Sequence, residues 1–170
     1  MVYHRTSTDD CAQCPTGTAA VPEMVYADWS SVLPAPFATE CYGACLTRGW
    51  SSSQDFVRAT ITAGKRSDMV LQLPLQILFG GEVEYTWSIE GDMEGSEFEV
   101  TINGLSVMSR TSGTSVTSRH SLRYGSHTIG FWAHASGYGT ASISITQVTV
   151  RGGSVGGTEE CMPCPAGYHQ

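Results

Sequence analysis

The sequence predicts an all-β protein, an antiparallel β-sandwich of jelly-roll type flanked at both ends by short disulfide-rich repeat segments. Three observations support this. Apolar and polar residues alternate over most of the chain, which is the period of a strand with one buried face. Helical periodicity is nearly absent, and turn residues recur at short intervals, as in sandwiches. A C-x-x-C-P motif stands near each end, at 11–15 and at 161–165.

The first expected strands follow residue 51. Upstream, residues 27–46 contain Pro34 and Pro36 and are expected to hold at most a short turn of helix. Residues 71–77 alternate cleanly, but Pro74 lies among them and predicts an edge strand or a bulge, because proline has no N–H to donate.

The clearest alternation covers residues 82–90, and a second alternating segment follows at 97–102. We expect these two strands to pair as a hairpin around the acidic turn between them. Its outer face would then collect four carboxylates, whose repulsion is mildly destabilising without an ion or a basic partner: Glu82, Glu84, Glu97 and Glu99.

The next segments complete the predicted sandwich of about eight strands. Asn103-Gly104 predicts a tight type I′ turn, since both central residues of that turn need positive φ. Residues 112–118 read as a polar loop or weak edge, and 127–134 as a strand. In the last strand, 142–150, the apolar parity switches, which indicates a bulge near Thr146-Gln147 or burial on both faces.

Composition gives a domain plan and excludes some functions. The 170 residues suit one domain with short appendages: the end of a cysteine-rich repeat at 1–20, the sandwich at 21–151, and a glycine-rich linker with the start of another repeat at 152–170. A net charge of −7 argues against nucleic-acid binding. No apolar run reaches about 18 residues, so we expect no membrane insertion by this segment.

All six cysteines are expected to form disulfides, which places the protein in an oxidising compartment. Cys41 and Cys45 are expected to pair with each other. The outer pairs are Cys11 with Cys14 and Cys161 with Cys164, and they could instead bind zinc or carry redox chemistry. The start of the chain lacks the apolar region of a signal peptide, so we expect a piece of a larger secreted or membrane-anchored protein.

Several segments resemble known extracellular modules. CAQCPTGT and CMPCPAG are similar to ephrin-receptor-like cysteine-rich repeats. DWSSVLPAPF, GGEVEYTWSIEGDMEGSEFEVTING, RHSLRYGSHTIGFW and ITQVTVRGGSVGGTEECMPCPAG resemble, in this order, the endosome/lysosome-associated apoptosis and autophagy regulator (ELAPOR) family. The resemblance covers residues 11–167 and fits less well at 41–50. It implies a non-enzymatic β domain in a large single-pass protein of the secretory and endolysosomal system.

Aromatic residues suggest a sugar-binding surface. Trp132 and His134 have the opposite parity to Phe131, so one set faces outward, and Tyr124 and Tyr138 could stack with them on a sugar ring. The alternative is that all four tryptophans fill the core: Trp29, Trp50, Trp87 and Trp132.

The acidic turn offers candidate calcium ligands in Glu90, Asp92 and Glu94, with a solvated loop as the alternative. No catalytic constellation is visible. The G-x-S-x-G match at 152–156 lacks a following helix, and the histidines show no metal-binding spacing.

These observations lead to one main functional expectation and one alternative. The main one is a non-enzymatic structural or protein-interaction module on the extracellular or lumenal side of a larger cell-surface or endolysosomal protein, bound to a protein partner or to neighbouring domains of its own chain. The alternative is a lectin-like carbohydrate-binding module, with calcium as a candidate cofactor.

Overall fold

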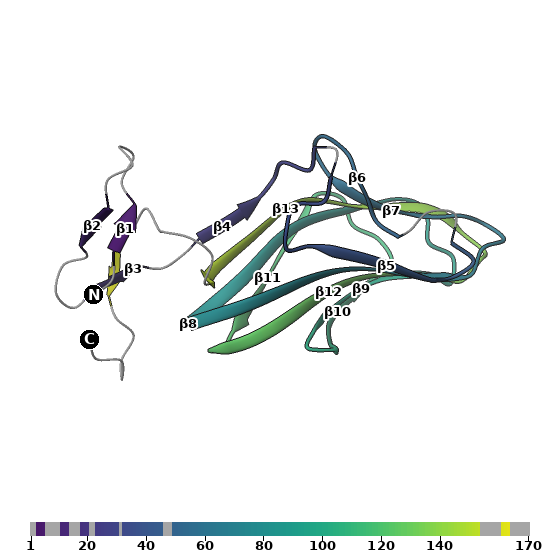
Figure 1. Cartoon of the computed structure of the whole chain (residues 1–170). Coiled ribbons are helices and arrows are strands. Elements are labelled where there is room, and N and C mark those ends of the chain that lie inside the picture. The colour runs from purple at the N-terminus through teal and green to yellow at the C-terminus, as the bar shows by residue number, and fades with distance from the viewer. Residues whose placement is uncertain are drawn as a thin grey trace.

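The structure is a computed structural model that describes residues 3–5, 11–13, 18–20, 23–30, 32–45, 49–153 and 161–163. All regular structure in these residues is β (Figure 1). No helix among them is long and apolar enough to span a membrane.

Ten strands hydrogen-bond into one continuous antiparallel network. Their bounds are β4 Glu23–Tyr26, β5 Ala38–Gly43, β6 Ser51–Ser52, β7 Val57–Ile61, β8 Ser67–Asp92, β9 Glu97–Ile102, β10 Leu105–Arg110, β11 Val116–Leu122, β12 Gly125–Ala135 and β13 Thr140–Gly153.

The network folds into two layers because the 26-residue strand β8 belongs to both. Residues 67–77 of β8 pair with β12 and, over 67–72, with β5, while β9 and β10 extend this first layer beyond β12. Residues 81–92 of β8 pair with β13 and, over 81–87, with β11 in the second layer, where β4 and β7 also pair with β13 and β6 extends β7. The two arms of β8 meet at one end of the sandwich (Figure 1).

Aromatic side chains from both layers fill the space between them. Trp87 of the second layer packs at 5.3 Å from Phe98 of the first, and Tyr85 at 5.1 Å from Phe131, measured between ring centroids. Trp29 and Trp50 are also buried in this core. Three of the four tryptophans therefore follow the core expectation, and Trp132 does not.

The predicted antiparallel β-sandwich is confirmed, and so are two of its local features. Asn103 and Gly104 have φ of 54° and 77° and join β9 to β10 as a two-residue turn. The register between β13 and β8 shifts between Ile145 and Gln147, where the parity switch predicted a bulge.

The predicted hairpin of residues 82–90 with 97–102 is wrong. These segments lie in different layers, since the second arm of β8 pairs with β13 and β11, whereas β9 pairs with β12 and β10. Glu82 and Glu84 therefore face away from one layer, and Glu97 and Glu99 from the other. Each pair meets its own polar partners: Arg119 and Arg151 for the first, and Ser109 and His134 for the second.

Two strands lie where the sequence suggested loops. β5 occupies part of the proline-containing segment, and β11 begins inside the polar stretch 112–118. Pro74 does follow its expectation in part, because β5 ends opposite Gln72 and leaves this stretch of β8 paired with β12 alone. A missing N–H is tolerated on an unpaired side.

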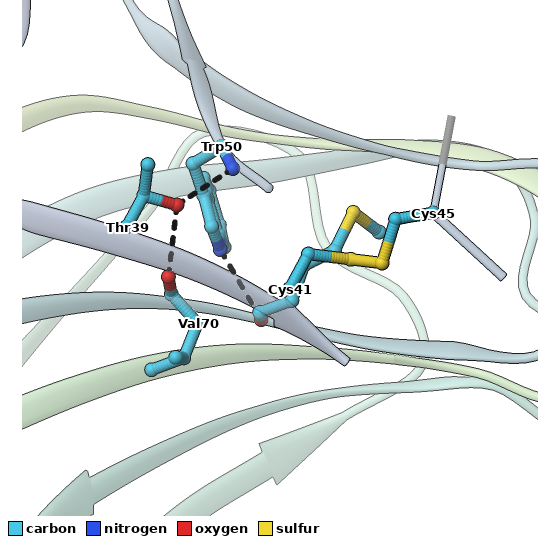
Figure 2. Close-up of a disulfide and its surroundings, with 6 residues drawn as sticks. Thr39, Cys41, Cys45, Trp50 and Val70 are labelled. Carbon is cyan, nitrogen blue, oxygen red and sulfur yellow. Dashed lines mark hydrogen bonds between the residues drawn. A yellow bond between two sulfur atoms is a disulfide. The ribbon is translucent and has the colours of Figure 1, made fainter. Parts of the chain in front are cut away.

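The predicted disulfide between Cys41 and Cys45 is present at the end of β5 (Figure 2). Beside it, the Thr39 hydroxyl donates to the Val70 carbonyl at 2.9 Å and accepts from the Trp50 amide at 2.8 Å. The Trp50 indole N–H donates to the Met69 carbonyl at 3.3 Å. These contacts fix the short edge strand β5 onto β8.

The flanking segments contain four more short strands: β1 Tyr3–Arg5, β2 Cys11–Gln13, β3 Thr18–Ala20 and β14 Cys161–Pro163. β1 pairs with β2, and β3 pairs with β14, so segments from the two ends of the chain hydrogen-bond to each other. Cys14 and Cys164, and the side chains of Cys11 and Cys161, lie outside the described residues, as do residues 154–160 of the expected linker.

Candidate functional site

The outer face of the first layer gathers polar and aromatic side chains from all five of its strands. Strand pairing sets them in rows across the sheet. One row runs from Ser109 on β10 through Glu99, Trp132 and Val70 to Glu40 on β5. The next row runs Glu97, His134, Asp68 and Tyr42. We call this surface the Trp132 face.

Trp132 is partly exposed and is held in one orientation. Its indole N–H donates to the Thr101 hydroxyl at 3.3 Å, and its ring is parallel to the His134 ring, with an interplanar angle of 4° and centroids 5.7 Å apart. Gly130 leaves room for it: a Cβ at that position would lie 2.8 Å from the indole nitrogen. A tryptophan fixed in this way loses little conformational entropy when a ligand contacts it.

His134 is hydrogen-bonded between two carboxylates from neighbouring strands. Its Nδ1 lies 2.7 Å from Asp68 Oδ1 on β8, and its Nε2 lies 3.0 Å from Glu99 Oε2 on β9. Ionised carboxylates only accept hydrogen bonds, so this geometry suits an imidazolium that donates from both nitrogens.

The pKa values agree with that assignment. Partial burial alone would lower the pKa of His134, but the hydrogen bonds to Asp68 and Glu99 and their charges outweigh it and raise the pKa. A hydrogen bond from Ser106 lowers the pKa of Glu99, and the hydrogen bond and charge of His134 lower it further against partial burial.

Two further carboxylates lie on either side of the Trp132 and His134 pair. Glu40 on β5 accepts a hydrogen bond from the Tyr42 hydroxyl, and Glu97 on β9 accepts one from the Ser109 hydroxyl at 2.6 Å. Both carboxylates are exposed, as is Tyr42. Val70 lies between them and is fully buried although it points away from the core. Side chains of the Trp132 face therefore cover this part of the sheet.

The structure brings together only part of the predicted sugar-binding set. Trp132 and His134 lie side by side on β12. Tyr138 lies in the turn after β12, near the His134 end, where it approaches Gly95 and is 72% exposed. Tyr124 is 66% exposed but precedes β12, eight residues or roughly 25 Å of extended strand from Trp132. Tyr124 is therefore not part of the face.

The candidate calcium ligands do not converge. Glu90, Asp92 and Glu94 are all exposed, and Asp92 Oδ1 accepts the backbone N–H of Glu94 at 3.0 Å. Among the residues with described positions, no group of three or more His, Cys, Asp or Glu side chains could hold a metal ion. The geometry of this turn is that of a capped, solvated loop.

Sequence reasoning missed most partners on the Trp132 face. Asp68, Glu99, Thr101 and Gly130 come from three strands, and only the register of those strands places them around Trp132. Alternation did place Asp68 opposite the core residues of its strand, but no signal in the sequence connected that strand to the histidine.

The fold is that of β-sandwich binding domains. A variant of the family 29 carbohydrate-binding module CBM29-2, solved with cellulohexaose, is 17% identical and superposes with a TM-score of 0.51 over 79% of this chain and 94% of that one. A second variant of the same module is 18% identical, with a TM-score of 0.50 over 79% and 93%. The K1 cleaved adhesin domain of Lys-gingipain from Porphyromonas gingivalis W83 is 13% identical, with a TM-score of 0.53 over 76% and 97%.

No protein-family model matches the chain, and no curated protein matches it. At the identities of the structural neighbours, the similarity establishes the shared sandwich fold. Any statement about a ligand must come from the residues of this chain.

Proposed function

We propose that this domain is a carbohydrate-binding module that holds a glycan on the Trp132 face. The observation that carries the proposal is the fixed, partly exposed indole of Trp132 surrounded by hydrogen-bonding side chains from neighbouring strands. Of the four tryptophans, the other three are buried in the core. The apolar face of a sugar ring stacks on such an indole, and its hydroxyls need polar partners around it.

The carboxylates of the face supply those partners. Asp68 and Glu99 each have lone pairs left beyond the hydrogen bond to His134, because a carboxylate has about four acceptor sites. Glu40 and Glu97 stand further out in the same rows. Hydroxyl donors of a sugar on Trp132 would meet acceptors on both sides.

Two further considerations support the proposal. The sandwich fold occurs in modules whose printed descriptions name carbohydrate binding, one of them bound to cellulohexaose. The cysteine-rich flanks and the resemblance to the ELAPOR family place the module, in our proposal, on the extracellular or lumenal side of a membrane-anchored protein, where glycans are abundant.

The test is glycan-array binding followed by calorimetry with the best ligand, comparing the native chain with Trp132→Ala. We expect the substitution to reduce affinity at least tenfold, since stacking on one aromatic contributes about 1–1.5 kcal/mol beyond the area that it buries. Tyr124→Ala is the matched control, because it removes an exposed aromatic ring at the other end of β12. Unchanged binding in Trp132→Ala, with the control also unchanged, would contradict the proposed site.

A structural or protein-interaction role remains a second proposal. Leu105 is 73% exposed and Val107 is 40% exposed on β10, the outermost strand of the first layer, and an exposed apolar strand edge suits a protein partner. Loss of a co-purifying partner on Leu105→Ser, with glycan binding intact, would show that the two roles use separate surfaces.

A further inference from the structure

We infer that the Trp132 face selects its glycan by charge: it takes glycans without acidic groups, and a free amino group on the sugar strengthens binding. This inference rests on the proposed function and names the class of ligand for the same site. The argument comes from the ionisable groups on the face, their partners and their exposure.

The described strand residues that face outward from the first layer carry four carboxylates and one imidazole: Asp68, Glu99, Glu40, Glu97 and His134. With His134 protonated, the face still has an excess of negative charge. The surplus lies at the surface, because the Asp68 side chain is 54% exposed and Glu40 and Glu97 are also exposed.

The arginines among the described residues do little to offset this charge. Arg119 and Arg151 form ion pairs with Glu84, Glu82 and Glu23 on the outer face of the second layer. Arg110 pairs in register with the core residue Phe98 at the edge strand, and its guanidinium donates to the Ser109 carbonyl. Arg66 directly precedes β8 and is the cation nearest to the Asp68 end of the face.

His134 does not provide an anion site. Both of its ring nitrogens already face carboxylates, at 2.7 and 3.0 Å, so neither has a proton left for a ligand carboxylate or sulfate. An acidic sugar on Trp132 would bring a negative charge beside Asp68 and Glu99 without a free donor to meet it. Like charges set against each other in this way disfavour a ligand.

An ammonium group has the opposite effect. It donates up to three hydrogen bonds, and the spare lone pairs of Asp68, Glu99 and Glu40 can accept them. The face of the Trp132 indole also attracts a cation. We therefore expect affinity to fall in the order amine-bearing, neutral, acidic, with each step on the order of tenfold at low salt, since the attraction and repulsion are both screened by ions.

The experiment measures the full chain against three oligosaccharides that share one β-1,4-linked glucose backbone: cellohexaose, fully deacetylated chitosan hexaose and the uronic-acid hexamer of cellulose. A glycan array with matched sialylated, sulfated and unmodified structures extends the comparison to other backbones. Each measurement is made at about 20 mM and about 500 mM salt, since high salt should compress the charge-dependent differences.

A double variant tests the cause. Glu40→Gln with Glu97→Gln removes two charges from the face but leaves the His134 hydrogen bonds in place, so it should narrow the gap between amine-bearing and acidic ligands. The control is Asp55→Asn with Glu90→Gln, which changes the net charge equally at exposed positions outside the first layer and should leave the gap unchanged.

The outcomes separate the two levels of the argument. Binding to neutral or amine-bearing glycans in preference to acidic ones, with the gap narrowed by the first double variant only, supports the inference. Equal or tighter binding of acidic glycans overturns it and leaves the proposed function standing. Absence of binding to every glycan on the array contradicts the proposed function itself, and this inference with it.

Discussion

At the scale of single residues, His134 is the ionisable group whose surroundings most clearly set its charge. Its neighbours Asp68 and Glu99 come from the strands on either side, and its ring is parallel to that of Trp132. The charge of this one side chain therefore affects both the stability of the first layer and the orientation of the aromatic ring next to it.

We predict that His134 titrates above the ordinary histidine pKa of 6.5, because the two carboxylates outweigh the effect of burial. A raised folded pKa means that this stabilisation is fully present below the unfolded pKa, about 6.5, and is lost as pH rises through the folded value. Side-chain NMR titration measures it directly. His120 provides an internal contrast, because burial lowers its pKa, and His134 titrating below His120 would contradict the assignment.

Gly130 tests how tightly the indole is placed. The Cβ of an alanine there would lie 2.6 Å from the Thr101 hydroxyl and 2.8 Å from the Trp132 indole nitrogen. We predict that Gly130→Ala keeps the fold but displaces Trp132, shifts its fluorescence and weakens glycan binding severalfold. Gly104→Ala, in the exposed β9–β10 turn, should leave both the fluorescence and the binding unchanged, although it strains a turn residue with positive φ.

At the scale of elements, β5 is the weakest part of the first layer. It is a six-residue edge strand with largely exposed side chains, fixed by the Cys41–Cys45 disulfide and the Thr39 hydrogen bonds (Figure 2). Glu40 and Tyr42 of the Trp132 face depend on its position.

We predict that Cys41→Ser with Cys45→Ser lowers the free energy of unfolding by about 2 kcal/mol, the loop-entropy value for so short a bridge. Hydrogen exchange should show faster exchange at the β5 amides that pair with β8, with β12 and β13 unaffected. Equal acceleration across both layers would contradict a local role for the bridge.

β5 and β11 also show why elements could be predicted only in part. Long alternating stretches such as those in β8 and β12 announce themselves, because one face is buried along their length. β11 is polar on most positions and β5 follows two prolines, so their strand conformation depends on the neighbour they pair with. The pairing of 82–90 with 97–102 failed for a related reason: alternation identifies strands but does not choose their partners.

At the scale of the whole molecule, the pairing of β3 with β14 joins the two ends of the chain. This arrangement agrees with a sandwich inserted into a cysteine-rich repeat. We predict a disulfide between Cys11 or Cys14 and Cys161 or Cys164, closing a loop of about 150 residues and constraining the unfolded chain by on the order of 5 kcal/mol. Non-reducing peptide mapping decides it, and recovery of peptides joined only within one flank would rule out the insertion.

Trp132 and His134 were the site residues that could be recognised in advance. Their parity along one strand, opposite to Ile129 and Phe131, separates the outer face from the core. The same reasoning could not exclude Tyr124 or include Asp68, because distance along a strand and contact across strands are different quantities. The calcium expectation had a similar weakness: three acidic residues close in sequence do not converge on one point in space.

The sequence by itself determined that the chain is an antiparallel sandwich, where its longest strands run and which of their faces is buried. It also determined the turn at Asn103-Gly104, the bulge in β13 and the pairing of Cys41 with Cys45. These are local properties, set by alternation, backbone conformation and short spacing. The tertiary structure alone decided that β8 passes from one layer to the other and that three strands surround Trp132 with Thr101, Asp68 and Glu99. Such contacts depend on strand register, which is fixed only when the two layers pack their buried faces together.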